Sequence, residues 1–206
     1  MTLDRPTRFV VAWAFGPSED ALAPPLVERT RRRSEGGGGV QWISDGKAVY
    51  RREVRRVYRD PKRTGRRGRP RLEPTPGVKL TQAVKRRERG RLIKVEVRPV
   101  IGEAPECPYA VCEERLNGVL RDRLNCLTRK THAFARQPQT WDAAVTLCLF
   151  EHNWLRPHRA LRQEAEGLPN GRRYLRRTPA MAQGLTDHVW SWTEFLLRPT
   201  YHYRKE

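Results

Sequence analysis

The N-terminal part of the sequence contains an almost uninterrupted apolar run, residues 8–15, in which aromatic and β-branched side chains predominate. Such a run is typical of a strand that is buried on both faces, as in a sheet with helices on either side. We therefore expect residues 8–15 to form a central strand of a sheet.

The segments that follow alternate between helix and strand patterns. Ser18 can cap a helix that runs to about residue 33, although Pro24 and Pro25 predict that it kinks or starts late. Residues 40–43 predict a short strand that ends at Asp45. Residues 47–58 predict a helix, because their apolar side chains recur with helical spacing.

The rest of the chain divides into a basic loop, a hairpin and several helices. Residues 59–77 are rich in Arg, Gly and Pro, which predicts a flexible loop, and residues 78–100 predict an inserted β-hairpin. Helices are expected at about residues 111–127 and 140–155, with a short one near residues 190–197. This order predicts an α/β fold with acidic residues at one edge of the sheet.

The charge of the chain indicates a polyanionic partner. Lys and Arg outnumber Asp and Glu by 42 to 23, which gives a net charge of +19. A field of this sign attracts nucleic acid, although a ribosomal or chromatin-type protein would have a similar charge. The sequence has no apolar run of the length that a membrane helix needs and no signal peptide, so we expect a cytoplasmic protein without membrane contact.

Two acidic residues are candidates for chemistry. Asp45 stands where a predicted strand meets a glycine, a place where α/β folds collect ligands, but Asp-Gly is also a common turn signal. On the helix after Cys112, Glu114 and Arg121 share the polar face, opposite the leucines. That face suits one metal contact and one phosphate contact, and it also suits an ordinary solvated helix.

The surroundings of these acids resemble the DDE-type insertion-sequence transposases, in particular the group related to insertion sequence one. The matching stretches are Leu3-Asp4-Arg5-Pro6-Thr7-Arg8, Ser44-Asp45-Gly46 with Tyr50, Glu114-Arg115-Leu116-Asn117 with Leu120-Arg121, Leu127-Thr128-Arg129-Lys130-Thr131, and Asn153 with Arg156-Pro157-His158 and Leu161. The resemblance covers most of the chain.

The resemblance implies a ribonuclease H-like fold, a mixed sheet flanked by helices. Residues 1–161 would form a partial catalytic domain that lacks its first strand, and residues 162–206 a helical C-terminal extension. The implied function is DNA transposition, in which DNA is cleaved and the freed 3′-OH attacks target DNA with two metal ions assisting.

The resemblance also implies the site residues. Asp45 would be the second catalytic Asp and Glu114 the catalytic Glu, both binding Mg²⁺ or Mn²⁺. The first catalytic Asp would precede this chain, since Asp4 matches a different position of the family; an upstream-encoded N-terminal segment would then supply it, or the gene is decayed. The residues expected to contact DNA are Arg115, Asn117, Arg121, Arg129, Lys130, Arg66, Arg67 and Arg69.

The partners implied are the transposon ends, the target DNA and a second copy of the chain in a synaptic complex. Two alternatives stay open. The chain can be a non-enzymatic basic DNA- or RNA-binding protein whose acids are structural, or a resolving or repair nuclease on the same fold.

Overall fold

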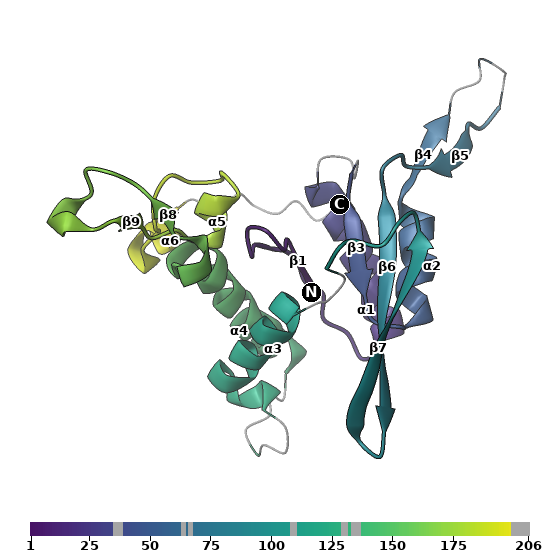
Figure 1. Cartoon of the computed structure of the whole chain (residues 1–206), viewed down its shortest axis with the longest axis horizontal. Helices are drawn as coiled ribbons and strands as arrows, with labels where there is room; N and C mark the ends of the chain where they lie inside the picture. The colour runs from purple at the N-terminus through teal and green to yellow at the C-terminus, as the bar shows by residue number, and fades with distance from the viewer. Residues whose placement is uncertain are drawn as a thin grey trace. The chain divides into compact units, whose positions relative to one another are not determined.

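The computed structural model describes residues 1–34, 39–62, 65, 68–107, 111–128, 132 and 137–198, and it is a mixed α/β structure (Figure 1). The chain divides into two compact units. The first contains Met1–Leu3 with Val11–Leu116, and the second contains Asp4–Val10 with Asn117–Glu206. The last change of unit, between Leu116 and Asn117, falls within helix α3 (Val111–Arg123).

The main sheet of the first unit is built around strand β6 (Lys79–Glu88), which lies between β3 (Gln41–Ser44) and β7 (Arg91–Ile101) (Figure 1). β3 pairs with β6 in parallel, from Gln41 opposite Lys79 to Ser44 opposite Gln82, and β7 pairs with β6 antiparallel. The hairpin itself was predicted, and its first strand is the middle strand of the sheet. Leu80 and Thr81 of that strand are fully buried.

The prediction of a central strand at residues 8–15 was wrong. Strand β2 covers only Val10–Ala12, and among the described residues its sheet partner is β1 (Thr2–Leu3) alone. The backbone of Arg8 has a left-handed φ of 62°, which ends the extended conformation on one side. Phe15 on the other side is 41% exposed, so the apolar run is only partly buried.

Helices α1 (Glu19–Arg33) and α2 (Ala48–Val57) pack together beside this sheet. Ser18 caps α1 by accepting a hydrogen bond from the N–H of Ala21 at 3.3 Å, so the helix starts at Glu19 and includes both prolines. The buried core consists of Val27, Trp42, Val54, Val57, Tyr58, Val78 and Leu80. Each fully buried aliphatic side chain contributes about 1.5–3 kcal/mol.

The segment expected as a basic loop contains a second antiparallel ribbon. β4 (Arg59–Lys62) pairs with β5 (Arg71–Pro74). Lys62 forms a cross-strand ion pair with Glu73 at 3.0 Å, and Asp60 pairs with Arg31 of α1. The composition of this segment predicted a loop, because composition carries no information about pairs between strands.

The turn of the β6–β7 hairpin follows from two residues with positive φ. Arg89 has φ 47° and Gly90 has φ 82°. Two positive values define the type I′ turn, whose twist matches that of the flanking strands. Leu92 and Ile93, just after the turn, are 51% and 63% exposed.

The second unit is mainly helical. Its helices are α3 (Val111–Arg123), which begins in the first unit, α4 (Pro138–Phe150), α5 (Pro179–Ala182) and α6 (Trp192–Leu197). A π-helical turn, Glu151–Leu155, continues α4. A small ribbon pairs β8 (Gln163–Glu164) with β9 (Tyr174–Leu175). The helices expected at 111–127, 140–155 and 190–197 are confirmed, although α3 ends earlier, α4 starts two residues earlier and α6 starts two residues later than expected.

The π-helical turn holds the N-terminal segment in place. The buried Asn153 accepts a hydrogen bond from the N–H of Val10 at 2.9 Å and donates one to its carbonyl at 3.1 Å. Nε2 of His152 lies 2.9 Å from the carbonyl of Arg8. His158 packs edge-on against His152, with ring centroids 4.5 Å apart. This part of the matching sequence therefore has a structural role here.

The two histidines predict acid sensitivity. Burial, together with the nearby His152, lowers the pKa of His158 to about 4, and burial also lowers the pKa of His152. Because these groups are neutral in the fold, their stabilising contribution is complete above the unfolded value of about 6.5 and is lost as the pH falls toward 4. Because His158 is only half-buried, solvent screens part of this effect, and we expect it to account for a loss of about 1–2 kcal/mol.

Chemical denaturation at a series of pH values measures this loss. His158→Gln should flatten the acid side of the stability profile. His188→Gln should not, because Asp187 and Glu194 raise the pKa of that exposed histidine. Equal acid slopes for the wild type and His158→Gln would contradict the assignment.

Candidate functional site

Asp45 lies directly after β3, at the carboxyl end of a strand in a parallel pair. Its exposed carboxylate accepts a hydrogen bond from the N–H of Lys47 at 3.2 Å. The buried Gln82 of β6 donates to the carbonyls of Asp45 and Lys47, both at 2.9 Å. The loop that carries Asp45 is thus fixed to the middle strand, at the edge of a sheet where α/β proteins bind ligands.

Gly46 is required for this loop to approach β6. A Cβ atom at this position would lie 2.9 Å from Cγ2 of Val84. Val84 is β-branched and has little freedom to rotate away. The Asp-Gly pair therefore reflects close packing against the sheet.

Glu114 lies in the first turn of α3 and forms an ion pair with Lys85 of β6. Both side chains are largely exposed, so the pair contributes little to stability. The neighbouring Glu113 acts on Tyr50 of α2: burial raises the pKa of Tyr50, and the charges of Asp45 and Glu113 raise it further. Asp45 and the first turn of α3 therefore belong to one electrostatic neighbourhood of the first unit.

The carboxylates of this neighbourhood do not form a metal site by themselves. Across the described ranges, no group of three His, Cys, Asp or Glu residues is arranged to hold a metal ion. Glu114 faces the ammonium group of Lys85. Asp4, which does not match a catalytic position of the family, accepts hydrogen bonds from the backbone N–H and the hydroxyl of Thr7 in its own turn. Mg²⁺ requires more oxygen ligands than Asp45 and Glu114 provide.

The residues expected to contact DNA are only partly described. Arg115 and Arg121 are exposed on α3, Asn117 is half-buried on the same helix, and Arg69 is exposed ahead of β5. The remaining four, Arg66, Arg67, Arg129 and Lys130, lie outside the described residues. Arg115 falls in the first unit, and Asn117 and Arg121 fall in the second.

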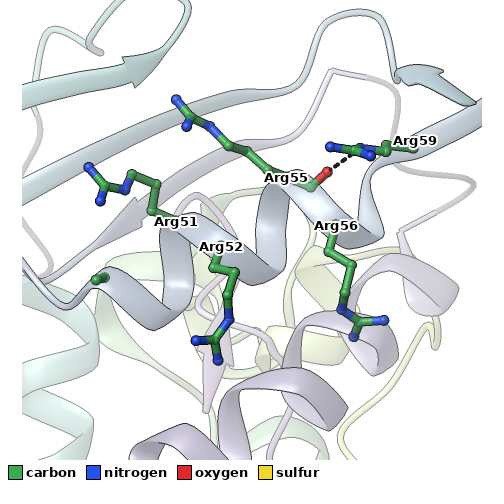
Figure 2. A pocket seen from close by; sticks show the side chains of 6 residues that line it. Arg51, Arg52, Arg55, Arg56 and Arg59 are labelled. Atoms are coloured by element: carbon green, nitrogen blue, oxygen red, sulfur yellow. Dashed lines mark hydrogen bonds between the residues drawn. The ribbon is translucent and has the colours of Figure 1, made fainter.

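Sequence reasoning missed a basic surface on α2. An open hollow of about 530 Å³ is lined by Ala48, Arg51, Arg52, Arg55, Arg56 and Arg59 (Figure 2). The spacing of these arginines, in steps of four along a predicted helix, was the signal that could have identified it.

Glu53 is the buried counterpart of this surface. Its carboxylate accepts hydrogen bonds from Nε of Arg52 at 2.9 Å and from Nε of Arg56 at 2.6 Å, and its side chain is only 5% exposed. Burial alone would raise the pKa of Glu53, but the hydrogen bonds and charges of the two arginines outweigh burial, so the pKa is lowered.

No family model matches this chain, and neither does a curated protein or a solved structure. None of the helices in the described part of the chain has the length and apolar character needed to cross a membrane.

Gly46→Ala tests the close packing of the Asp45 loop. The added methyl group should lower the free energy of unfolding by about 1–2 kcal/mol, because it overpacks against Val84. The double variant Gly46→Ala, Val84→Ala should recover most of the loss relative to Val84→Ala alone, as measured by urea denaturation. Additive losses would contradict the contact.

Glu53→Gln tests the buried carboxylate. The substitution should cost about 2 kcal/mol of unfolding free energy at neutral pH, because two charge-assisted hydrogen bonds are weakened. Since the native pKa of Glu53 is lowered, the difference from the wild type should shrink as the pH falls below about 4.5. The exposed Glu28, which pairs with Arg56, is the control, and Glu28→Gln should cost less than about 1 kcal/mol.

Proposed function

We propose that this chain is a DNA-binding part of a DDE-type transposase and carries two of its metal-binding carboxylates, Asp45 and Glu114. One observation carries the proposal: a single strand, β6, fixes the Asp45 loop through Gln82 and binds Glu114 through Lys85. Two acids from separate elements are thus each connected to strand β6.

The arrangement of the first unit supports a ribonuclease H-like fold. β3 and β6 are parallel, α2 lies between them in the sequence, and α3 with Glu114 follows the sheet. Within the described residues, β3 has a strand on one edge only. We assign the first strand of the fold, which would bear the third carboxylate, to this open edge, where it would lie next to Asp45.

The ion pair between Glu114 and Lys85 is consistent with this assignment. Lys85 pairs with Glu114, and in the described part of the chain the acidic residues of this neighbourhood form no group of three that could hold a metal ion. Because two carboxylates hold Mg²⁺ or Mn²⁺ weakly, DNA cleavage and strand transfer are expected only from the protein with a complete sheet.

DNA is the partner that the charge supports. A net charge of +19, to which the exposed Arg115 and Arg121 contribute, gives affinity for phosphates without reading the DNA sequence. The same basic surface, together with the Lys85–Glu114 pair, favours the second candidate, a non-enzymatic DNA- or RNA-binding protein.

The test is to coexpress this chain with the segment translated from the DNA immediately upstream and to assay nicking and strand transfer on duplex DNA. We expect Mg²⁺-dependent activity that falls to background in Asp45→Asn and in Glu114→Gln, with DNA affinity unchanged or slightly increased. Glu113→Gln is the matched control and should remain active, because the adjacent Glu113 lies outside the matching stretch.

Full activity of Glu114→Gln would show that the assignment of this residue is wrong. DNA binding without any metal-dependent reaction in the coexpressed protein would favour the non-enzymatic candidate instead. Absence of DNA binding by the wild-type chain would contradict the transposase, and absence of both DNA and RNA binding would contradict both candidates.

A further inference from the structure

The arginines of α2 form two rows that differ in their surroundings. Arg51, Arg55 and Arg59 are spaced by four residues, so their Cα atoms follow one another at about 6 Å along a helix. Arg52 and Arg56 form the second row. Figure 2 shows Arg51 and Arg55 pointing to one side of α2, and Arg52 and Arg56 pointing to the other. We call Arg51, Arg55 and Arg59 the outer row.

Acidic side chains engage the second row. Arg52 pairs with Glu53, Arg56 pairs with Glu53 and Glu28, and a longer contact of 3.9 Å joins Arg52 to Asp20. These arginines neutralise a buried carboxylate and connect α2 to α1. Their role in the fold accounts for their presence.

The outer row has no acidic partner among the described residues. Nη2 of Arg55 donates a long hydrogen bond to the carbonyl of Val100 at 3.4 Å, and Nε of Arg59 donates to the carbonyl of Arg55 at 2.8 Å. The second bond keeps Arg59 next to the end of α2, although it belongs to β4. Since each guanidinium has five N–H donors, most donors of the row remain open to an external acceptor.

The outer row does not stabilise α2. Arg51 lies in the first turn of the helix, which has no acidic residue, and a cation at a helix N-terminus opposes the helix dipole. Like charges four residues apart are also unfavourable in a helix. Residues 47–62 contain seven Lys and Arg against two acidic residues, so the neighbourhood adds to this repulsion. An anionic ligand would relieve it.

We propose that the outer row binds the sugar-phosphate backbone of duplex DNA, one phosphate to each guanidinium. The hollow beside it is open and lined by five arginines, which suits an extended polyanion. Phosphates follow one another every 3.4 Å of axis along each DNA strand, so cations about 6 Å apart can meet different phosphates. This inference rests on the proposed function, because it takes DNA as the partner.

The test compares the full chain with the variant Arg51→Gln, Arg55→Gln, Arg59→Gln in binding to a short duplex of mixed sequence. The matched control is Arg159→Gln, Arg172→Gln, Arg176→Gln, which removes the same charge from exposed positions of the second unit. Fluorescence anisotropy between about 50 and 200 mM salt gives the affinity and its salt dependence.

We expect the outer-row variant to reduce the slope of log K against log salt by about 2–3, at about 0.9 for each lost phosphate contact. Its affinity should fall about tenfold to a hundredfold near 0.1 M salt, while the control changes both quantities by clearly less. Each single substitution should lower the slope by about 1. Thermal unfolding of the outer-row variant should occur at or slightly above the wild-type temperature, because the substitutions remove exposed cations that repel one another, so a loss of DNA affinity would not reflect a loss of fold.

If the two triple variants lost DNA affinity and salt slope equally, only net charge would matter, and the inference would be overturned. An outer-row variant that binds like the wild type would overturn it too. If the wild type prefers an RNA duplex of the same sequence, and only that binding depends on the outer row, the assignment to DNA is wrong. A wild type that binds no duplex refutes the proposed function itself, so the two failures are distinct.

Discussion

The parallel pairing of β3 with β6 determines where the chemical groups of the first unit lie. Gln82 completes this pairing with its side chain, since it bridges the two carbonyls of the loop that follows β3. The loop then brings Asp45 to the sheet edge, and the next residues of β6 contact Gly46 and Glu114. Loss of the β3–β6 register by one residue would turn Gln82 to the other face and separate these groups.

The charged side chains of α2 differ in whether they contact the buried carboxylate of Glu53. Glu53 faces the interior between Arg52 and Arg56, and this buried network joins α2 to α1 through Glu28. Of the arginines that remain outside it, Arg55 and Arg59 donate to backbone carbonyls. A single helix thus combines a neutralised side that supports the fold with a cationic side that is available to a ligand. The arginines that pair with Glu53 determine which side is neutralised.

Local patterns predicted the elements better than their partners. Ser18 identified the start of α1, and the apolar spacing after Asp45 identified α2, because capping and periodicity are local. The pairing of β6 with β3 depends on residues far apart in sequence, and no local pattern specifies it. Asp45 was placed correctly at a strand end, while Gln82 and Lys85, which organise the site, read as ordinary strand residues. Glu53 was overlooked because a charged residue is rarely buried without partners, and its partners follow only from the folded helix.

The bond between Asn153 and Val10 has a consequence for synthesis. Asp4–Val10 belongs to the second unit, so the polypeptide passes from one unit to the other at three points, and neither unit is a continuous stretch of sequence. The two bonded residues are 143 positions apart. On the ribosome, the first segment to emerge must therefore wait until most of the chain has been translated before Asn153 can bind it. During that interval the apolar side chains of residues 8–15 lack part of their final cover, so this is the stage at which a nascent chain of this kind is most exposed to aggregation.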